Sequence, residues 1–230
     1  MAIDIPARVL VITPHPDDAE FGASGTVAKW AKGGAEVTYV LCTDGGKGTS
    51  DRSVTTQKII EVRDQEQRDA CNALGVKNLV TLSYPDGRIE YTDKFLKDII
   101  RQIRRFKPDV VMAPDFFRKS NWHRDHRVTG QVVADACYPF ARDHLHFPEL
   151  VEQEKLEPHK TRTLMMWGAE EPDCFIDITE TMDRKIAALK AHASQVGNNF
   201  EDRVKETARG HGMHTYSQYA EAFRRLDFRV

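Results

Sequence analysis

The sequence lacks features that would assign it to several large classes of protein. None of its apolar runs approaches the ~20 residues that a membrane-spanning helix needs. Its 33 basic and 35 acidic residues nearly cancel, and a formal net charge of −2 gives no electrostatic basis for binding nucleic acid or an anionic membrane. The first eight residues show no basic region followed by an apolar core, so we expect no signal peptide.

Cysteines are few and widely separated in this chain. The four thiols are Cys42, Cys71, Cys137 and Cys174, and no C-x-x-C pair occurs. This spacing excludes the paired cysteines of a zinc ribbon or a thioredoxin-like redox motif. Reduced thiols are typical of the cytoplasm, so we expect a cytoplasmic protein.

The chain is long enough for one domain with a sizeable core. It has 230 residues, with no internal repeat, low-complexity tract or linker that would divide it. We therefore predict a single domain over residues 1–230, with a core of roughly 1–192 and a C-terminal extension over 193–230.

Apolar strand patterns alternate with helical ones through the first 140 residues. Strands are predicted at 8–12, 36–42, 79–83 and 109–113, and helices at 19–32, 54–74, 93–106 and 125–138. This alternation predicts an α/β fold with a mostly parallel sheet covered by helices on both faces. Further on, we expect a surface excursion at 140–160, strands at 164–167 and 174–178, a helix at 179–192, and then loops with one or two helices.

Four polar residues each follow a predicted strand: His15, Asp44, Asp86 and His123. Because the carboxyl ends of parallel strands meet at one rim of a sheet, these residues should gather there. Ligands of open α/β sheets bind at that rim, so the site is expected there.

Two charged segments stand out at this rim. His15-Pro16-Asp17-Asp18-Ala19-Glu20 follows the first strand, and His123-Arg124-Asp125-His126 follows the fourth. Together they offer nitrogen and oxygen donors for one divalent metal, with Asp17 placed to act on the metal's water. The simpler alternatives are a polar turn with Asp17 or Asp18 as a helix N-cap, and a solvated loop that begins a helix.

These residues resemble the LmbE-like (PIG-L) family of zinc-dependent de-N-acetylases. The stretch from His15 to Glu20 looks like the family's first motif, and His123-Arg124-Asp125-His126 is similar to its second, H-x-D-H. The resemblance covers most of the chain, with weaker matches at 43–45, Arg63, Glu66, 74–76, 85–87 and 192–195.

The resemblance implies a Rossmann-like fold, one Zn²⁺ per subunit and hydrolysis of the N-acetyl group of a glucosamine-containing substrate by a zinc-bound water. By position, His15, Asp18 and His126 match the metal ligands, and Asp17 matches the general base. His123 matches the oxyanion-stabilising histidine, with Asp125 beside it to keep it protonated. Another divalent metal, such as iron or cobalt, also suits these donors. Relatives of this length often form hexamers, so a homo-oligomer is expected.

Four further residues are candidates for substrate contacts: Asp44, Arg63, Asp86 and His192. Each has a simpler interpretation. Asp44 lies in a glycine-rich loop, 43–49, that could be merely flexible or could hold a phosphate. Arg63 could lie on a solvated helix face, Asp86 could serve only a turn, and His192 could simply end its helix. In its functional interpretation, His192 is a second polar group over the metal, in its own or a neighbouring subunit's site.

The sequence leaves other functions open beside N-deacetylation of an amino sugar. One is hydrolysis of a different amide, such as a thiol conjugate, on the same metal site. A second is nucleotide binding by loop 43–49 without hydrolysis, and a third is an inactive relative. Zinc content with chelator-sensitive activity favours the enzyme, whereas stabilisation by nucleotide without metal favours the binding protein.

Overall fold

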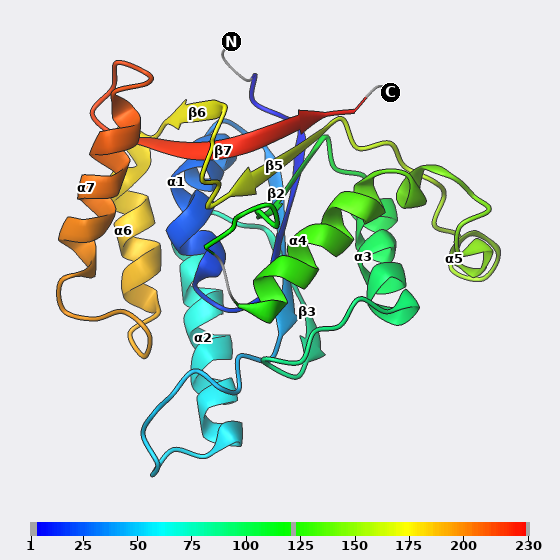
Figure 1. Cartoon of the computed structure of the whole chain (residues 1–230), viewed down its shortest axis with the longest axis horizontal. Helices are drawn as coiled ribbons and strands as arrows, with labels where there is room; N and C mark the ends of the chain where they lie inside the picture. The colour runs from blue at the N-terminus through cyan, green and yellow to red at the C-terminus, as the bar shows by residue number, and fades with distance from the viewer. Residues whose placement is uncertain (1–3, 121–122, 229–230) are drawn as a thin grey trace.

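A seven-stranded sheet crosses the centre of the computed structural model, which describes residues 4–120 and 123–228 (Figure 1). The strand order is β3-β2-β1-β4-β5-β7-β6, with parallel pairing from β3 to β5 and antiparallel pairing of β7 with β5 and β6. This confirms the predicted α/β domain with a mostly parallel sheet. In chain order the strands are β1 (Arg8–Thr13), β2 (Glu36–Thr43), β3 (Asn78–Tyr84), β4 (Val110–Pro114), β5 (Thr163–Trp167), β6 (Cys174–Asp177) and β7 (Ala220–Asp227).

Helices cover the two faces of the sheet as two groups (Figure 1). α1, α2, α6 and α7 lie on one side, and α3 and α4 lie on the other. No helix in the described part of the chain is both long and apolar enough to cross a membrane. The helices are α1 (Asp18–Lys32), α2 (Thr56–Leu74), α3 (Asp93–Phe106), α4 (Arg124–Cys137), α5 (Pro148–Glu152), α6 (Met182–Ala191) and α7 (Phe200–Gly212), with short 3₁₀ turns at Phe140–Arg142 and Thr179–Thr181.

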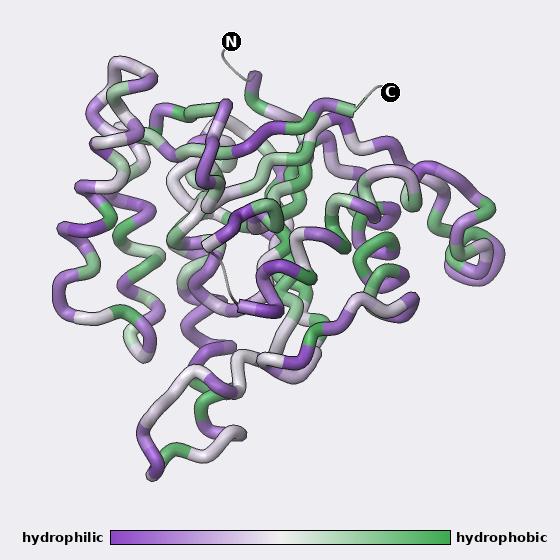
Figure 2. The backbone as a smooth tube through the Cα atoms, in the orientation of Figure 1, coloured by the Kyte–Doolittle hydropathy of each residue, from purple (hydrophilic) through white to green (hydrophobic). Residues whose placement is uncertain are grey.

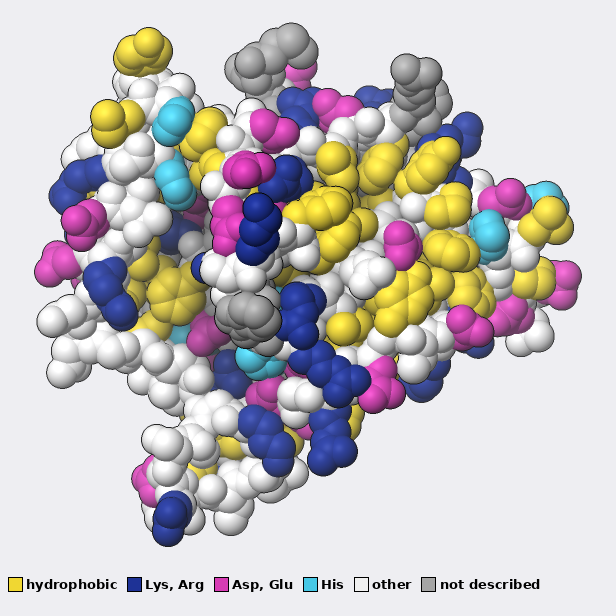
Figure 3. Space-filling view, viewed as in Figure 1, with side chains coloured by type: hydrophobic (Ala, Val, Ile, Leu, Met, Phe, Trp, Pro, Cys, Tyr) yellow, Lys and Arg dark blue, Asp and Glu magenta, His cyan; other side chains and the backbone are white. Residues whose placement is uncertain are grey.

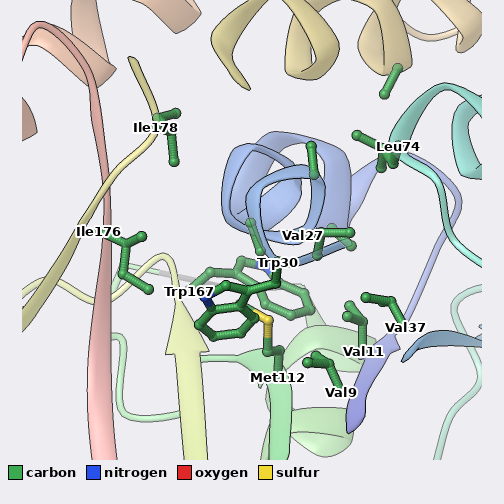
Figure 4. Packing of buried hydrophobic residues seen from close by; sticks show 14 of the residues in the cluster. Val9, Val11, Val27, Trp30, Val37, Leu74, Met112, Trp167, Ile176 and Ile178 are labelled. Atoms are coloured by element: carbon green, nitrogen blue, oxygen red, sulfur yellow. The ribbon is translucent and has the colours of Figure 1, made fainter. Parts of the chain in front are cut away.

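The apolar run in β1 explains why this strand is central. Val9 and Val11 point into the core under α1, whereas Leu10 and Ile12 point into the core under α3 and α4. Successive strand residues face opposite sides, so a strand covered on both faces must be apolar throughout. Burial of each such side chain contributes about 1.5–3 kcal/mol. The green central strands of Figure 2 and the packed side chains of Figure 4 show the result.

Helix α1 packs closely on the sheet because glycines face its neighbours. A methyl group at Gly22 would lie 2.2 Å from Trp167 Cδ1, and one at Gly25 would lie 2.6 Å from Ile178 Cδ1. Only glycine therefore permits this approach. The close packing fixes the N-terminus of α1 at the sheet rim, where the first charged motif lies.

The segment 193–230 differs from its prediction as loops and one or two helices. It contains α7, as expected, but also β7, which is inserted between β5 and β6. The first six residues of β7 read Ala-Glu-Ala-Phe-Arg-Arg and include no β-branched side chain, so local propensity for a strand is weak. The expected C-terminal extension is thus an internal part of the sheet.

The segment 140–160 is also less exposed than a surface excursion would be. Ala141 and Leu150 are fully buried in the core under α3 and α4. Arg104 of α3 is buried as well, and its guanidinium donates to the carbonyls of Phe140, Ala141, Asp143 and His146 at 2.6–3.3 Å. One buried cation therefore holds this segment against the fold.

Arg104→Ala should lower the free energy of unfolding by about 2–3 kcal/mol, the usual cost of removing hydrogen bonds that involve a buried charged group. Four backbone carbonyls would lose their donor. Arg105→Ala, on the same helix but exposed, is the matched control and should change stability by less than ~0.5 kcal/mol. Urea denaturation of both variants measures the difference, and equal midpoints would contradict the assigned role.

Candidate active site and metal centre

The turn between β1 and α1 carries the polar side chains of His15, Asp17 and Asp18, and Asp17 has an unusual backbone conformation. Asp17 has φ 87°, in the left-handed region, and stands at the N-cap position of α1 without a side-chain capping hydrogen bond. Asp18 accepts a hydrogen bond from the backbone N–H of His15. A left-handed conformation at a non-glycine residue costs of order 1–3 kcal/mol and is retained where function needs it. Capping therefore does not account for Asp17.

Three donor atoms of the predicted metal ligands meet at one point. His15 Nδ1 lies 2.9 Å from Asp18 Oδ2, His126 Nε2 lies 3.1 Å from the same oxygen, and the two nitrogens are 3.3 Å apart. Donor atoms at the corners of a tetrahedron with zinc bonds of ~2.0 Å are separated by about 3.3 Å. The donor set of His15, Asp18 and His126 thus fits a metal of that size.

The other nitrogen of His15 faces a second acidic group. Its Nε2 lies 3.1 Å from Asp125 Oδ2 and 3.2 Å from Asp86 Oδ1, a cluster that also has metal-binding spacing. The Asp125 oxygens already accept the backbone N–H groups of Gly87 and Ile89 at 2.8 and 3.1 Å. All three side chains in this cluster are buried. Its geometry suits a carboxylate that orients a metal-ligating histidine from behind.

Carboxylates surround His15 on both sides of its ring. Burial opposes protonation of this imidazole, but the hydrogen bonds with Asp125, Asp18 and Asp86 outweigh burial and raise its pKa to about 11. The same negative charge would favour a metal cation at this point.

Asp17 lies beside the donor set without joining it. Burial and the negative charge of Asp18 raise the pKa of Asp17 to about 7, against the opposing effect of Arg63. Its Oδ2 is 3.9 Å from Arg63 Nη2. A buried carboxylate with a raised pKa has the properties of a general base that works near neutral pH.

His123 lies over the same point from the N-terminus of α4. Its ring is 4.6 Å from the ring of His15 and 4.9 Å from that of His126, between centroids. Burial and the charges of these two histidines lower its pKa. The Asp125 carboxylate bonds to His15, Gly87 and Ile89, whereas Asp125 meets His123 through its backbone N–H. The negative charge of Asp125 opposes this lowering of the His123 pKa, so the expected support of a protonated His123 stays a prediction.

The four residues that follow strands do come together at the rim. Asp86 contacts His15, and the backbone N–H of Asp86 donates to Asp44 Oδ1 at 3.1 Å. His123 contacts His15 through its ring. Arg63 lies among them: it donates to the carbonyls of Gly45 and Pro16, and its Nη1 is 3.7 Å from Asp86 Oδ2. Arg63 is buried, so it does not lie on a solvated helix face.

His192 lies beside Glu20 in the first turn of α1. Its side chain is fully buried, and its Nε2 is 3.6 Å from Glu20 Oε2. Burial opposes its protonation, but the nearby Glu20 carboxylate outweighs burial and raises the pKa. Glu20 Oε1 accepts a hydrogen bond from Gln67 at 2.8 Å. His192 therefore contacts the first turn of α1, and its expected contact with a substrate stays a prediction.

Several supporting contacts were not predicted from the sequence. Glu66 accepts from the backbone N–H and hydroxyl of Ser194, both at 2.7 Å, which joins α2 to the segment after α6. Lys185 and Glu221 form a buried ion pair at 2.7 Å beside α1. In the sequence, Glu66 and the segment 192–195 are only weak matches to the family, and Lys185 and Glu221 give no signal. Pairs so far apart in sequence leave no local pattern.

The pattern of the whole chain matches known proteins. The family model described as "GlcNAc-PI de-N-acetylase" (PIG-L) matches residues 10–137. Diacetylchitobiose deacetylase of Thermococcus kodakarensis is 31% identical over 221 residues, which cover 94% of this chain and 82% of the relative. A probable N-acetyl-alpha-D-glucosaminyl L-malate deacetylase 2 of Bacillus cereus is 31% identical over 200 residues, or 85% of this chain and 86% of the relative.

A solved structure shares the fold closely. The N,N'-diacetylchitobiose deacetylase from Pyrococcus horikoshii, in complex with its inhibitor MPG, superposes with a TM-score of 0.91 at 30% identity, over 96% of this chain and 84% of that one. The family model spans more than half of the sequence, and both sequence and structure agree across most of these relatives. The chain described here belongs to the PIG-L (LmbE-like) family.

Proposed function

We propose that this protein is a metal-dependent hydrolase that removes the N-acetyl group from an N-acetylglucosamine-type sugar or its conjugate. The observation that carries this proposal is the triangle of His15 Nδ1, Asp18 Oδ2 and His126 Nε2, with Asp17 beside it. The named activities of the Thermococcus and Bacillus relatives support the same reaction class and an N-acetylated amino sugar as the substrate.

The two other activities considered from sequence are less well supported. The relatives matched over more than four fifths of both chains are named as deacetylases, which disfavours a thiol-conjugate amidase. In loop 43–49, the backbone N–H groups of Gly46 and Lys47 donate to the carboxylates of Asp44 and Asp86. A phosphate cradle needs such N–H groups free and no carboxylates at the anion site, so nucleotide binding by this loop is disfavoured.

We propose zinc as the metal, held by His15, Asp18 and His126. Two imidazoles and one carboxylate suit this borderline ion, and three protein ligands are typical of a catalytic site. A bound divalent metal would supply Lewis acidity to the amide carbonyl and to the attacking water. Asp125 and Asp86 would orient His15 through its Nε2, rather than act as ligands.

The side chains around this centre have distinct proposed roles. Asp17 takes a proton from the attacking water as the new C–O bond forms, and it returns the proton to the amine nitrogen as the C–N bond breaks. His123 stabilises the developing charge on the carbonyl oxygen. Arg63 holds Asp17 and the turn, and Asp44, Arg63 and Asp86 form the polar side that receives the sugar hydroxyls. Three expectations stay predictions. They are a role of His192 at the substrate, a homo-oligomeric assembly (a hexamer by family resemblance) and a cytoplasmic location.

Purified protein should contain one zinc ion per chain and should release acetate from N-acetylglucosamine, N,N'-diacetylchitobiose or an N-acetylglucosamine–malate conjugate. Because the metal would supply the Lewis acid, a strong chelator should abolish the release, and added Zn²⁺ should restore it. Elemental analysis and an acetate assay measure the two quantities. Acetate release by a metal-free sample that is unchanged by chelator would contradict the proposal.

A further inference from the structure

A cavity of about 560 Å³ opens beside two of the proposed metal ligands. Asp18 and His126 form one end of it, and the rest extends between α1, β5, β7 and α7. Figure 3 shows hydrophobic side chains that gather between α7 and the centre of this face. The lining includes six apolar side chains: Phe21, Trp167, Phe200, Val204, Ala208 and Ala222.

The buried charges in the cavity wall are already paired. Lys185 Nζ lies 2.7 Å from Glu221 Oε1, and Asp115 Oδ2 accepts a hydrogen bond from Arg224 at 3.1 Å. Arg118 and Arg203 also line the cavity, but both are exposed. A ligand therefore meets mainly apolar surface beyond Asp18 and His126, without an unpaired buried charge.

The sheet order places polar and apolar surfaces on opposite sides of the metal donors. Asp86 and Asp44 follow β3 and β2, the donors belong to the β1–α1 turn and α4, and the cavity lies beyond the ends of β4, β5 and β7. None of Asp17, Arg63 or Asp86 lines the cavity. An amide at the donors thus has a polar neighbourhood on one side and an apolar one on the other.

The two halves of an N-acylated amino sugar have the same asymmetry. Sugar hydroxyls need hydrogen-bonding partners when they leave water, which the carboxylates and Arg63 offer. The alkyl chain of the acyl group has no atom that needs a hydrogen-bonding partner. An acetyl methyl is about as large as one water molecule, whose share of liquid volume is ~30 Å³, and it would fill only a small part of the cavity.

Resting on the proposed function, we propose that this cavity binds the acyl group of the substrate, and that the enzyme hydrolyses N-acyl amino sugars with chains longer than acetyl. The reaction is unchanged: water adds its oxygen to the carbonyl carbon, the C–N bond breaks, and the products are a free amine and a longer carboxylate. The sugar then lies toward Asp44 and Asp86, and the chain lies between α1 and α7.

The test compares kcat/KM for N-acetyl-, N-butyryl- and N-hexanoyl-glucosamine with the metal-loaded protein. We expect a rise with chain length of up to about fourfold per methylene, the gain from burying one CH₂ group. Hexanoate should also inhibit more strongly than acetate, because the product carboxylate keeps the same chain in the cavity. Inhibition provides a readout of binding that is independent of turnover.

Two tryptophan substitutions on α7 locate the chain. Val204→Trp fills the cavity, whereas Glu206→Trp adds the same ring at an exposed position that does not line it. The ratio of hexanoyl to acetyl kcat/KM should fall at least tenfold in Val204→Trp and stay as in the wild type in Glu206→Trp. If circular dichroism shows that Val204→Trp does not fold, the wild-type series and the inhibition by carboxylates decide.

The outcomes separate this inference from the proposed function. Acetate release from the N-acetyl sugar with a tenfold or greater drop at N-butyryl overturns the acyl assignment and leaves deacetylation in place. An unchanged ratio in Val204→Trp overturns the location of the chain. Failure to hydrolyse any of the three sugars overturns the proposed function, and the inference with it.

Discussion

Asp17→Asn should lower kcat by about 100- to 10,000-fold, the range for loss of a general acid–base group, while the protein keeps its fold and its metal. The amide has the shape of the carboxylate but cannot accept the water's proton. Asparagine also tolerates the left-handed conformation seen at φ 87°, which alanine would strain. Steady-state kinetics at measured metal content gives the effect.

Asp18→Asn is the control for this substitution. Weakening a ligand should lower metal occupancy first, so its loss of activity should be recovered in part by excess Zn²⁺. Elemental analysis of both variants distinguishes the two aspartates. If Asp17→Asn loses metal while Asp18→Asn keeps it, the two roles are reversed. If Asp17→Asn keeps full turnover, another group accepts the water's proton, and His123 becomes the leading candidate for the base.

Glu221→Gln should lower the free energy of unfolding by about 3–5 kcal/mol, the cost of leaving one member of a buried ion pair unpaired. Glu221 accepts from Lys185 and from the backbone N–H groups of Gly25 and Thr26 at 2.7–2.9 Å. Lys185 in turn donates to the carbonyls of Glu20 and Phe21. The pair therefore joins β7 and α6 to the backbone of α1. Glutamine removes the negative charge that Lys185 pairs with and one of the two oxygens that accept from α1.

Glu180→Gln provides the matched comparison. Glu180 pairs with Lys32 of α1 at 3.2 Å, but their side chains are 84% and 58% exposed. An exposed pair of this kind contributes about 0–1 kcal/mol. The decrease in the free energy of unfolding, measured by chemical denaturation, should thus be several-fold larger for Glu221→Gln than for Glu180→Gln. Equal losses would show that the buried pair does not hold α1 in place.

The first 140 residues could be predicted well because their signals are local. Val9–Leu10–Val11–Ile12 is apolar throughout, and Gly75 ends α2 with φ 78°, as a helix C-terminus favours. β7 was missed because its pairing partners, β5 and β6, provide the strand conformation that its own residues do not favour. The strand conformation of β7 thus depends on tertiary contacts, which cannot be recognised from a short segment of sequence.

The candidate site was likewise predictable only in part from the sequence. The resemblance of two short motifs to the family was enough to group His15, Asp18 and His126, and their donor atoms do lie together. The partner of Asp125 was not predictable, because it depends on the turn after β3 that brings Gly87 and Ile89 to its carboxylate. Burial of His192 beside α1 likewise depends on how α6 packs against α1 and α2.

The ion pair of Lys185 and Glu221 has a consequence for the order in which the chain is made. Synthesis delivers His15 and Asp18 first and His126 about midway, but α1 gains its last backbone contacts only when residue 221 arrives. Domains fold as units during translation. We therefore expect α1, which carries the proposed metal ligand Asp18 at its N-terminus, to reach its final position only after β7 has been made.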